Sequence, residues 1–467
     1  MSDGVLPVIV IFWAVAFGYV SLQRRGKETD PLIDELEDDA CSESRLVEQL
    51  ASTKQKWQYD VEMERYLRQL PKVELHVHLD GSFDPLLLQE HLKTTQDFSC
   101  LPVEATSPWD KSTVLVREMV KESTHDDKRF HSLCTCRGKG SLHEMIKCFE
   151  VFVPIVRGNL ELLEQLSHDF VRRQSQQNIV YTEVRYSPHL LAEGGDFSGT
   201  QQVDADPVVD AVTRGLRRGE TDFGVKVNQI MCCIAWRPDW ADDVIRIAQE
   251  RRNDAPCAIV GVDIAAGEEH FDKENFPHLY EPHYKAFQRA QELGLNITMH
   301  AGEAGGEENI KMAVQEYGAT RIGHGYRIVR DSKLMEEMRG VHFEICPTSS
   351  VETGGWVYKM RNWNEHPAVQ MIRSGMKVGF NSDDPAVFDT SLTWQLRVAL
   401  GKMGLSKKCL LQAAHNSIDA AFLNPEEKDV LRRRLIDFTN TSIDRHAAQK
   451  YYDERVGSFA QHEMEES

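Results

Sequence analysis

Side chains that can hold a metal ion or move a proton recur at four places in the sequence. These places are H-V-H, M-H-A-G-E, G-H-G and N-S-D-D-P, which contribute His76, His78, His300, Glu303, His324, Asp383 and Asp384. Three imidazoles and a carboxylate match the ligands of a catalytic zinc or a similar borderline cation, with open coordination left for water. Such a metal lowers the pKa of water toward neutrality and supplies hydroxide at physiological pH. These residue types therefore predict metal-dependent hydrolysis.

The spacing within two of these places bears on that interpretation. His76 and His78 are two residues apart, so on a strand both side chains point to the same face and can bind one ion. Taken alone, the pair is equally compatible with two structural histidines. Asp383 and Asp384 are adjacent carboxylates, which repel each other unless a cation or hydrogen-bond donors compensate. Because coincidence at four separate places is hard to sustain, we interpret them as one site.

Each of these places lies in or at the end of a β-rich run, and longer helical patterns separate the runs. Eight runs can be placed, at 73–79, 179–187, 225–236, 258–265, 296–303, 319–326, 341–349 and 376–384. Alternating strands and helices indicate an α/β protein with a parallel sheet. Eight such strands close a (β/α)8 TIM barrel, whose active site lies at the carboxyl ends of the strands. We therefore predict this fold, with additional helices at the C-terminus.

Two helical regions can be anticipated around that barrel. The gap from Gly81 to Asn178, after the first strand, is longer than one crossover and predicts a long helical insertion that forms a lid over the site. Within it, 142–152 (LHEMIKCFEVF) has an apolar face that could meet a substrate or be a plain core stripe. The run 284–294 predicts a helix that Gly294 terminates.

Composition limits the classes of partner. With 41% hydrophobic and 27% charged residues, the chain has ample material for a globular core. A net charge of -19 repels phosphate backbones, so we expect a small-molecule substrate and no nucleic acid. The ten cysteines lack the spacing of a disulfide scaffold. A second metal at Cys134, Cys136, Cys148 and His131 is an alternative, but C-x-C spacing suits structural zinc poorly, and ordinary thiols are favoured.

The N-terminus predicts a membrane anchor over residues 1–27. Val5 to Leu22 is almost wholly apolar, and as a helix it would cover about 27 Å, close to a hydrocarbon core. The basic residues that follow would place the catalytic domain in the cytoplasm. A cytosolic chain is the alternative, because Pro7 and Gly18 weaken a short span. We expect an acidic linker at 28–56, the catalytic barrel at 57–450 and a polar tail at 451–467, while no motif indicates an oligomeric state.

The ordered motifs resemble those of the adenosine deaminase family. The similarity runs from about Pro71 to about Pro425, and its motifs are KVELHVHLDGS, YTEVRYSPH, MHAGEAG, IGHGYR, FEICPTSS-x-x-TGGW, FNSDDP and NSIDAAFLNP. The resemblance implies one Zn²⁺ per chain, bound by His76, His78, His300 and Asp383. It further implies that Glu303 protonates the purine N1 and that His324 orients or deprotonates the attacking water.

The resemblance also assigns substrate contacts. Asp384 is implied to hydrogen-bond the purine near N7, and Asp80 to bind the ribose. The fourth strand ends D-I-A-A-G-E-E where the family usually shows A-G-D-E. The glycine whose N–H meets purine N3 is therefore matched by Gly267, or it is replaced by Ala266. Attack of hydroxide at purine C6 requires N1 to be protonated, so Glu303 needs a pKa that burial has raised.

The implied activity is hydrolytic deamination of adenosine, and of 2′-deoxyadenosine, to inosine and ammonia in purine salvage. A deaminase of AMP or N6-substituted AMP is one alternative, but it would need basic or amide donors for a phosphate, and none cluster beside HVHLDGS. A two-metal hydrolase bridged by a modified lysine is disfavoured, because GVDIAAGEE contains no lysine. A catalytically silent adenosine-binding protein is the third alternative.

Overall fold

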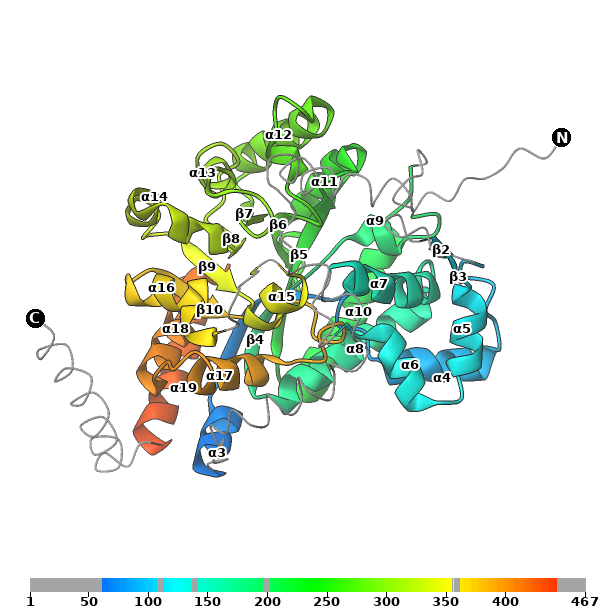
Figure 1. Ribbon diagram of the computed structural model, residues 1–467, viewed down its shortest axis with the longest axis horizontal. Helices are drawn as coiled ribbons and strands as arrows, with labels where there is room; N and C mark the ends of the chain where they lie inside the picture. Colours follow the sequence, from blue (N-terminus) through cyan, green and yellow to red (C-terminus); the bar gives the residue numbers. More distant parts are fainter. Residues whose placement is uncertain are drawn as a thin grey trace, which may run out of the picture.

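A parallel sheet of eight strands forms the centre of the molecule. The computed structural model describes residues 61–103, 105–106, 113–136, 142–195, 202–354, 356 and 362–442. Neighbouring strands pair in parallel in the order β1-β4-β5-β6-β7-β8-β9-β10 (Figure 1). The strands are β1 (Lys72–His78), β4 (Ile179–Tyr186), β5 (Lys226–Ile234), β6 (Ile259–Ala265), β7 (Asn296–Ala301), β8 (Arg321–His324), β9 (His342–Ile345) and β10 (Lys377–Phe380). All eight predicted strands are present, which confirms the (β/α)8 barrel.

The first and last strands meet at the residues that follow β10. Val77 forms an isolated parallel bridge with Asp383. The N–H of His78 donates to the carbonyl of Asp383 at 2.8 Å, and the N–H of Asp383 donates to the carbonyl of His76 at 3.1 Å. The side-chain oxygen of Asn381 accepts from the N–H of both Leu75 and His76. This seam fixes two segments with predicted metal ligands against each other.

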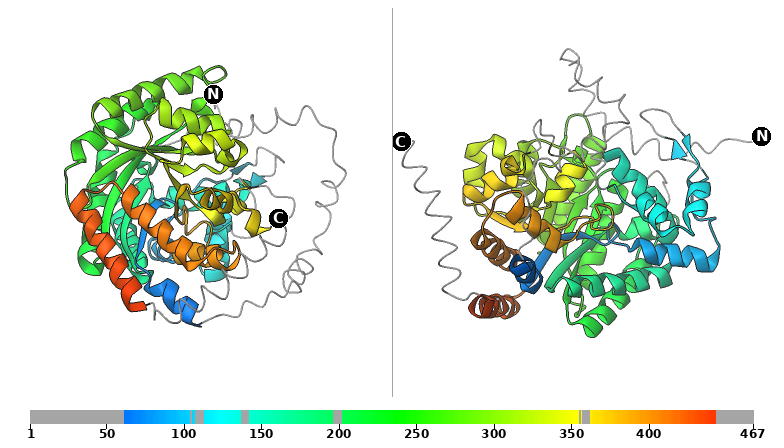
Figure 2. Two further views of the ribbon diagram at one scale, coloured as in Figure 1. Left: turned by 90° about the vertical axis from the view of Figure 1, so that its left-hand side faces the viewer. Right: turned by 60° about the horizontal axis from the view of Figure 1, so that its bottom comes forward.

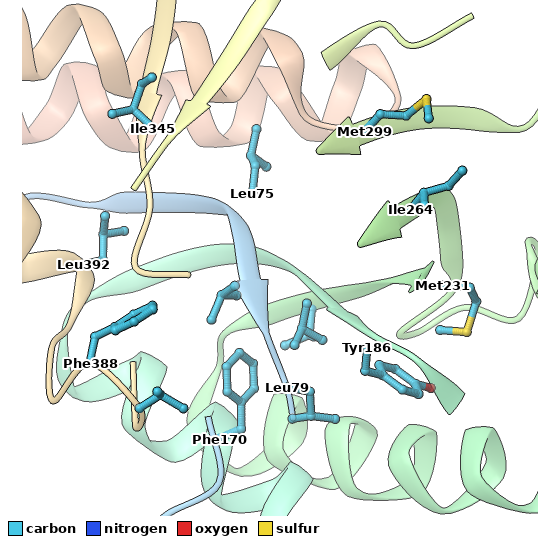
Figure 3. Close-up of a cluster of buried hydrophobic side chains, with 14 of the residues drawn as sticks. Leu75, Leu79, Phe170, Tyr186, Met231, Ile264, Met299, Ile345, Phe388 and Leu392 are labelled. Atoms are coloured by element: carbon cyan, nitrogen blue, oxygen red, sulfur yellow. The ribbon is translucent and has the colours of Figure 1, made fainter. Parts of the chain in front are cut away.

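Alternation along β1 separates the core from the site. Leu75 and Val77 are fully buried in the main hydrophobic cluster. Met299 of β7 and Ile345 of β9 belong to the same cluster (Figure 3). Because successive side chains of a strand point to opposite faces, the intervening histidines of β1 project from the other face.

Helices surround the barrel on its outside (Figures 1 and 2). Those between or beside the strands are α8 (Leu160–Gln176), α9 (Pro188–Leu191), α10 (Asp206–Phe223), α11 (Ala241–Arg251), α12 (Pro277–Glu292), α13 (Glu307–Gln315), α14 (Ser332–Glu337), α15 (Pro347–Glu352) and α16 (Pro367–Arg373). Short 3-10 helices are η3 (Pro238–Trp240), η4 (Glu269–Phe271), η5 (Tyr326–Arg330) and η6 (Trp363–Glu365). The helix predicted at 284–294 is the second half of α12, and Gly294 follows it at φ +65°.

The predicted C-terminal helices and the insertion after β1 are also present. α17 (Leu392–Gly401), α18 (Lys407–Ala420) and α19 (Pro425–Ser442) follow β10, and α17 contacts α3 (Val61–Gln69). The insertion comprises α4 (Pro85–Thr95), β2 (Ala105–Thr106), β3 (Thr113–Val114), α5 (Val116–Ser123), α6 (Asp127–Cys134) and α7 (Leu142–Val156). In α7, Met145 and Phe149 pack against the core cluster, as expected of a core stripe.

The prediction of a membrane-anchored chain with a cytoplasmic catalytic domain is corrected. Across the described ranges, no helix is both long enough and apolar enough to cross a bilayer. A span needs about 20 consecutive, mostly apolar residues, whereas α10 and α19, with 18 residues each, carry repeated charged side chains. Residues 1–27, on which the prediction depended, lie outside the described residues, as do the predicted linker at 28–56 and tail at 451–467.

Close packing of α8 against α10 gives a test of the fold. A Cβ added at Gly215 of α10 would lie 2.3 Å from the carbonyl oxygen of Glu164 in α8. Gly215→Ala must therefore push the two helices apart, which we expect to cost about 1–3 kcal/mol of stability. Its thermal melting midpoint should fall, whereas Gly340→Ala, which adds a methyl where no atom lies within 4 Å, should melt with the parent. Equal melting of both variants would contradict the packing described.

Candidate active site

Four of the predicted residues bring potential ligand atoms together at the carboxyl ends of their strands. The atoms belong to His76, His300, His324 and Asp383, and all lie within 4.8 Å of one another. They come from β1, β7, β8 and the segment after β10. In the described part of the chain this is the one such group, so the alternative second metal site at the cysteines gains no support. Burial raises the pKa of the Cys134 thiol to about 12, which keeps it neutral.

His78 lies beside this group. Its Nε2 is 3.2 Å from Nε2 of His300 and 3.5 Å from Oδ1 of Asp383. The four predicted ligands and His324 therefore face one centre, and they do so from strands far apart in sequence. Imidazole nitrogens this close to each other and to a carboxylate need a proton or a cation between them.

The orientation of the imidazoles suits a metal ion. Nδ1 of His76 lies 2.7 Å from Oε2 of Glu344, while the buried Nε2 lies 3.1 Å from Oδ1 of Asp383. Nδ1 of His300 lies 3.0 Å from Oδ2 of Asp263. A carboxylate on one ring nitrogen directs the other toward a metal and raises its basicity. The donor set and its orientation thus fit a transition metal with nitrogen and oxygen ligands.

A buried arginine joins the two supporting carboxylates. Arg185 of β4 donates to Asp263 and to Glu344, both at 2.7 Å, and all three side chains are fully buried. Burial alone would raise the pKa of Glu344, but Arg185 and Arg321 hold that pKa well below its usual range. Burial alone would also raise the pKa of Asp263, but the positive charges of His300 and Arg185 lower it below its usual range. Both carboxylates therefore stay charged.

Glu303 lies on the loop between β7 and α13, where it can exchange a proton. Its Oε2 is 3.6 Å from Nε2 of His324. Burial raises the pKa of Glu303, and the negative charges of Asp383 and Glu268 add to the rise, against the opposing effect of His324. A carboxyl group with a raised pKa can hold a proton at a pH where an exposed glutamate has lost it.

Two further carboxyl groups, Asp80 and Asp384, complete the wall of the site. Burial raises the pKa of Asp80 to about 6, although backbone donors near Ser187 and Gly81 oppose the rise. Burial raises the pKa of Asp384 well above its usual range, and Asp383, Asp80 and Glu303 raise it further. A Cβ at Gly81 would lie 1.8 Å from Oδ1 of Asp384, so only glycine admits this carboxyl group.

The turn after β6 contains the position predicted to meet purine N3. Both candidates adopt left-handed backbone conformations, with φ +71° at Ala266 and +149° at Gly267. A Cβ at Gly267 would lie 2.4 Å from Oε2 of Glu269 and 2.9 Å from the ring of Trp236. Glycine is therefore required at 267, whereas Ala266 adopts a conformation that a side chain disfavours.

Sequence reasoning missed the supporting residues. Asp263, Glu344 and Arg185 are placed behind the imidazoles, and Glu268 lies beside the loop that carries Glu303. A signal for two of them exists, since IVGVDIA and HFEI each place a carboxylate inside an otherwise mostly apolar strand. Such a buried charge is retained only with a partner.

Comparison with known proteins places the sequence in one family. The model of the adenosine deaminase family matches residues 71–438. Adenosine deaminase of Xenopus tropicalis is 32% identical over 376 residues, which cover 79% of this chain and 95% of that protein. The bovine (Bos taurus) enzyme is 31% identical over 374 residues, which cover 77% and 92%.

Solved structures share the fold. A Zn-bound amidohydrolase from Burkhoderia ambifaria superposes with a TM-score of 0.63 and 20% identity over 85% of this chain and 97% of that one. The N6-methyl-AMP deaminase from Arabidopsis thaliana gives 0.61 and 22% identity over 81% and 99%. At these identities the structures support the barrel alone, whereas the sequence matches extend over most of both chains. The chain is thus a member of the adenosine deaminase family and a hydrolase that acts on carbon–nitrogen bonds.

Proposed function

We propose that this chain hydrolyses adenosine, and 2′-deoxyadenosine, to inosine and ammonia. The observation that carries the proposal is the convergence of the histidines and Asp383 on one centre, with Glu303 and Asp384 beside it as carboxyl groups of raised pKa. That arrangement offers both a metal site and proton donors for a purine ring. The family membership supports the same reaction. Because the proposed reaction releases inosine, we assign it to purine salvage.

We further propose that His76, His78, His300 and Asp383 hold one Zn²⁺ per chain. When bound, such an ion lowers the pKa of water and so supplies hydroxide near neutral pH. The hydrogen bonds that Nδ1 of His76 donates to Glu344 and Nδ1 of His300 donates to Asp263 support this assignment, because they leave Nε2 of each ring directed at the centre.

Glu303 and His324 carry the proton transfers. Burial raises the pKa of Glu303, which favours the protonated carboxyl group that can donate to purine N1 as C6 becomes tetrahedral. His324 lies 3.6 Å from Glu303 and 3.8 Å from Oδ2 of Asp383. From there its Nε2 can orient the attacking water or take its proton.

Three residues bind the substrate in this proposal. Asp384, whose pKa is raised well above its usual range, can donate a hydrogen bond from its protonated carboxyl group to N7. Asp80 accepts hydrogen bonds from the ribose hydroxyls. Gly267 offers its N–H to N3, since its missing Cβ lets the purine approach the backbone.

Charge favours adenosine over AMP. The wall of the site contains Asp80, Glu303, Asp383 and Asp384, and burial, together with the negative charges of Asp383, Asp80 and Glu303, raises the pKa of Asp384 well above its usual range. A phosphate dianion placed beside the carboxylate that Asp80 offers to the ribose would be repelled, whereas a neutral nucleoside would not. Arg185, which lies next to the site, already donates to Asp263 and Glu344.

Substrate preference is the first test. We expect the purified protein to convert adenosine to inosine with a kcat/KM at least about 100-fold above that for AMP or N6-methyl-AMP, because a buried like-charge contact costs several kcal/mol. The fall in ultraviolet absorbance measures the conversion, and metal analysis measures the zinc content. A preference for AMP would overturn the substrate. Stoichiometric zinc with adenosine bound but not converted would indicate a binding protein.

Metal binding is tested by a substitution that touches no proposed ligand atom. A Cβ at Gly323 would lie 2.7 Å from Cε1 and 3.1 Å from Nδ1 of His76. Gly323→Ala should turn this imidazole and weaken Zn²⁺ binding by roughly 10–100-fold, as loss of a supporting contact does. His78→Ala should lose the ion, and Gly340→Ala should retain it. Titration of the chelator-treated proteins with Zn²⁺ decides, and an unchanged affinity in Gly323→Ala would exclude His76 as a ligand.

The role of Glu303 predicts a loss of rate without a loss of binding. Glu303→Gln should lower kcat by roughly 10²–10⁴-fold, the usual value of general acid catalysis, and leave KM within a few fold. The zinc content should not change. Asp80→Ala serves as the contrast, because loss of a ribose contact should raise KM. A kcat within tenfold of the parent in zinc-replete Glu303→Gln would mean that the proton comes from another group.

A further inference from the structure

A glutamate outside the proposed mechanism is bonded to the loop that carries Glu303. Glu268 lies between the turn after β6 and η4, and it is 8% exposed. Its carboxylate accepts five hydrogen bonds of 2.8 to 3.0 Å, from the backbone N–H groups of Gly302, Glu303, Ala304 and Gly305 and from the side-chain amide of Asn309. A carboxylate has about four lone-pair sites, so these donors use its full capacity.

The opposite edge of the loop is held by Arg327. Its N–H donates to the carbonyl of Gly302 at 3.0 Å, and its Nε donates to the carbonyl of Glu303 at 3.3 Å. Glu268 therefore binds the N–H side of the peptide chain at Glu303, and Arg327 binds the carbonyl side. A backbone bonded on both sides has little freedom to change the direction of the Cα–Cβ bond from which the Glu303 side chain extends.

The glycines of the loop make room for this contact. A Cβ at Gly305 would lie 2.0 Å from Nδ2 of Asn309 and 2.5 Å from Oε2 of Glu268. Gly302 has φ +70°, and a Cβ there would lie 2.5 Å from Cδ1 of Ile310. A side chain at Gly302 would thus collide with α13, and a side chain at Gly305 would collide with both α13 and Glu268.

We propose that Glu268 is a positioning residue for Glu303. Its carboxylate fixes the peptide groups from 302 to 305, and these hold the Glu303 carboxyl group beside His324, ready to meet purine N1. The carboxylate of Glu268 accepts hydrogen bonds only from the loop and from Asn309, and it contacts no reacting atom. The inference rests on the proposed role of Glu303, but the hydrogen bonds that carry it are independent of the substrate.

Kinetics of three variants of the full chain, each loaded with zinc, provide the first arm of the test. Glu268→Ala leaves four backbone donors without an acceptor, and kcat should fall by roughly 10–100-fold, because a misplacement of about 1 Å costs that much. KM should stay within threefold. Glu268→Gln keeps one oxygen for the three donors at Oε1 and should recover most of kcat. Glu308→Gln, an exposed glutamate of α13, should match the parent.

A double-mutant cycle separates positioning from a general loss of structure. If Glu268 acts through Glu303, adding Glu268→Ala to Glu303→Gln should lower kcat by less than threefold, since the group being positioned is already gone. A purely structural role predicts the same 10–100-fold loss in both backgrounds. Full additivity would therefore overturn the proposal, as would a kcat of Glu268→Ala within twofold of the parent.

Hydrogen exchange reports on the loop without any substrate. In Glu268→Ala the amides of 302–305 should exchange at least about tenfold faster, while those of β7 remain protected. Gly305→Ala, which pushes Glu268 away, should accelerate the same amides. Unchanged exchange in both variants would contradict the hydrogen-bonded contact between Glu268 and the loop. An inactive parent would instead overturn the proposed function, and the exchange rates would still decide whether Glu268 fixes the loop.

Discussion

The buried guanidinium of Arg185 between Asp263 and Glu344 is the contact on which the rest of the site depends. Each of these carboxylates also meets the Nδ1 of one histidine, so a single cation sets the orientation of His76 and His300. A buried charge without its partner costs about 3–5 kcal/mol. Because all three side chains are fully buried, water cannot replace any of their contacts with one another. Their relative positions are therefore fixed once the barrel closes.

The same network ties the site to the base of the barrel. Arg321 of β8 donates to Glu344 at 2.7 Å and to Glu183 of β4 at 2.5 Å. Glu183 in turn accepts from the N–H of Phe422, which follows α18. The ring of Phe422 lies 3.8 Å from the guanidinium of Arg321. The segment after α18 therefore contacts the charged side chains behind the site, and the C-terminal helices do more than cover the sheet.

The sequence predicted the strands and the residues proposed as ligands, but not the groups behind them. Strands can be recognised because each is a local pattern of residues. The motifs H-V-H and D-D can be recognised because paired ionisable residues are unusual at the end of a strand. The partner of Asp263 is different, because Arg185 is 78 positions away and becomes its neighbour only through the strand order β4-β5-β6. The role of Glu268 could not be predicted from the sequence either, because its partners are backbone N–H groups, which every residue except proline carries.

Backbone strain at the site shows what this network achieves. His324 and Asp383 have φ of +61° and +66°, and Ala266, in the turn that leads to Glu268, has +71°. Such conformations cost about 1–3 kcal/mol each outside glycine and persist only where the surroundings impose them. At Asp383 the surroundings are the two backbone hydrogen bonds to β1, which close the barrel. The barrel seam thus holds a proposed ligand in a conformation that the chain alone would abandon, so closure of the fold and assembly of the site are one event.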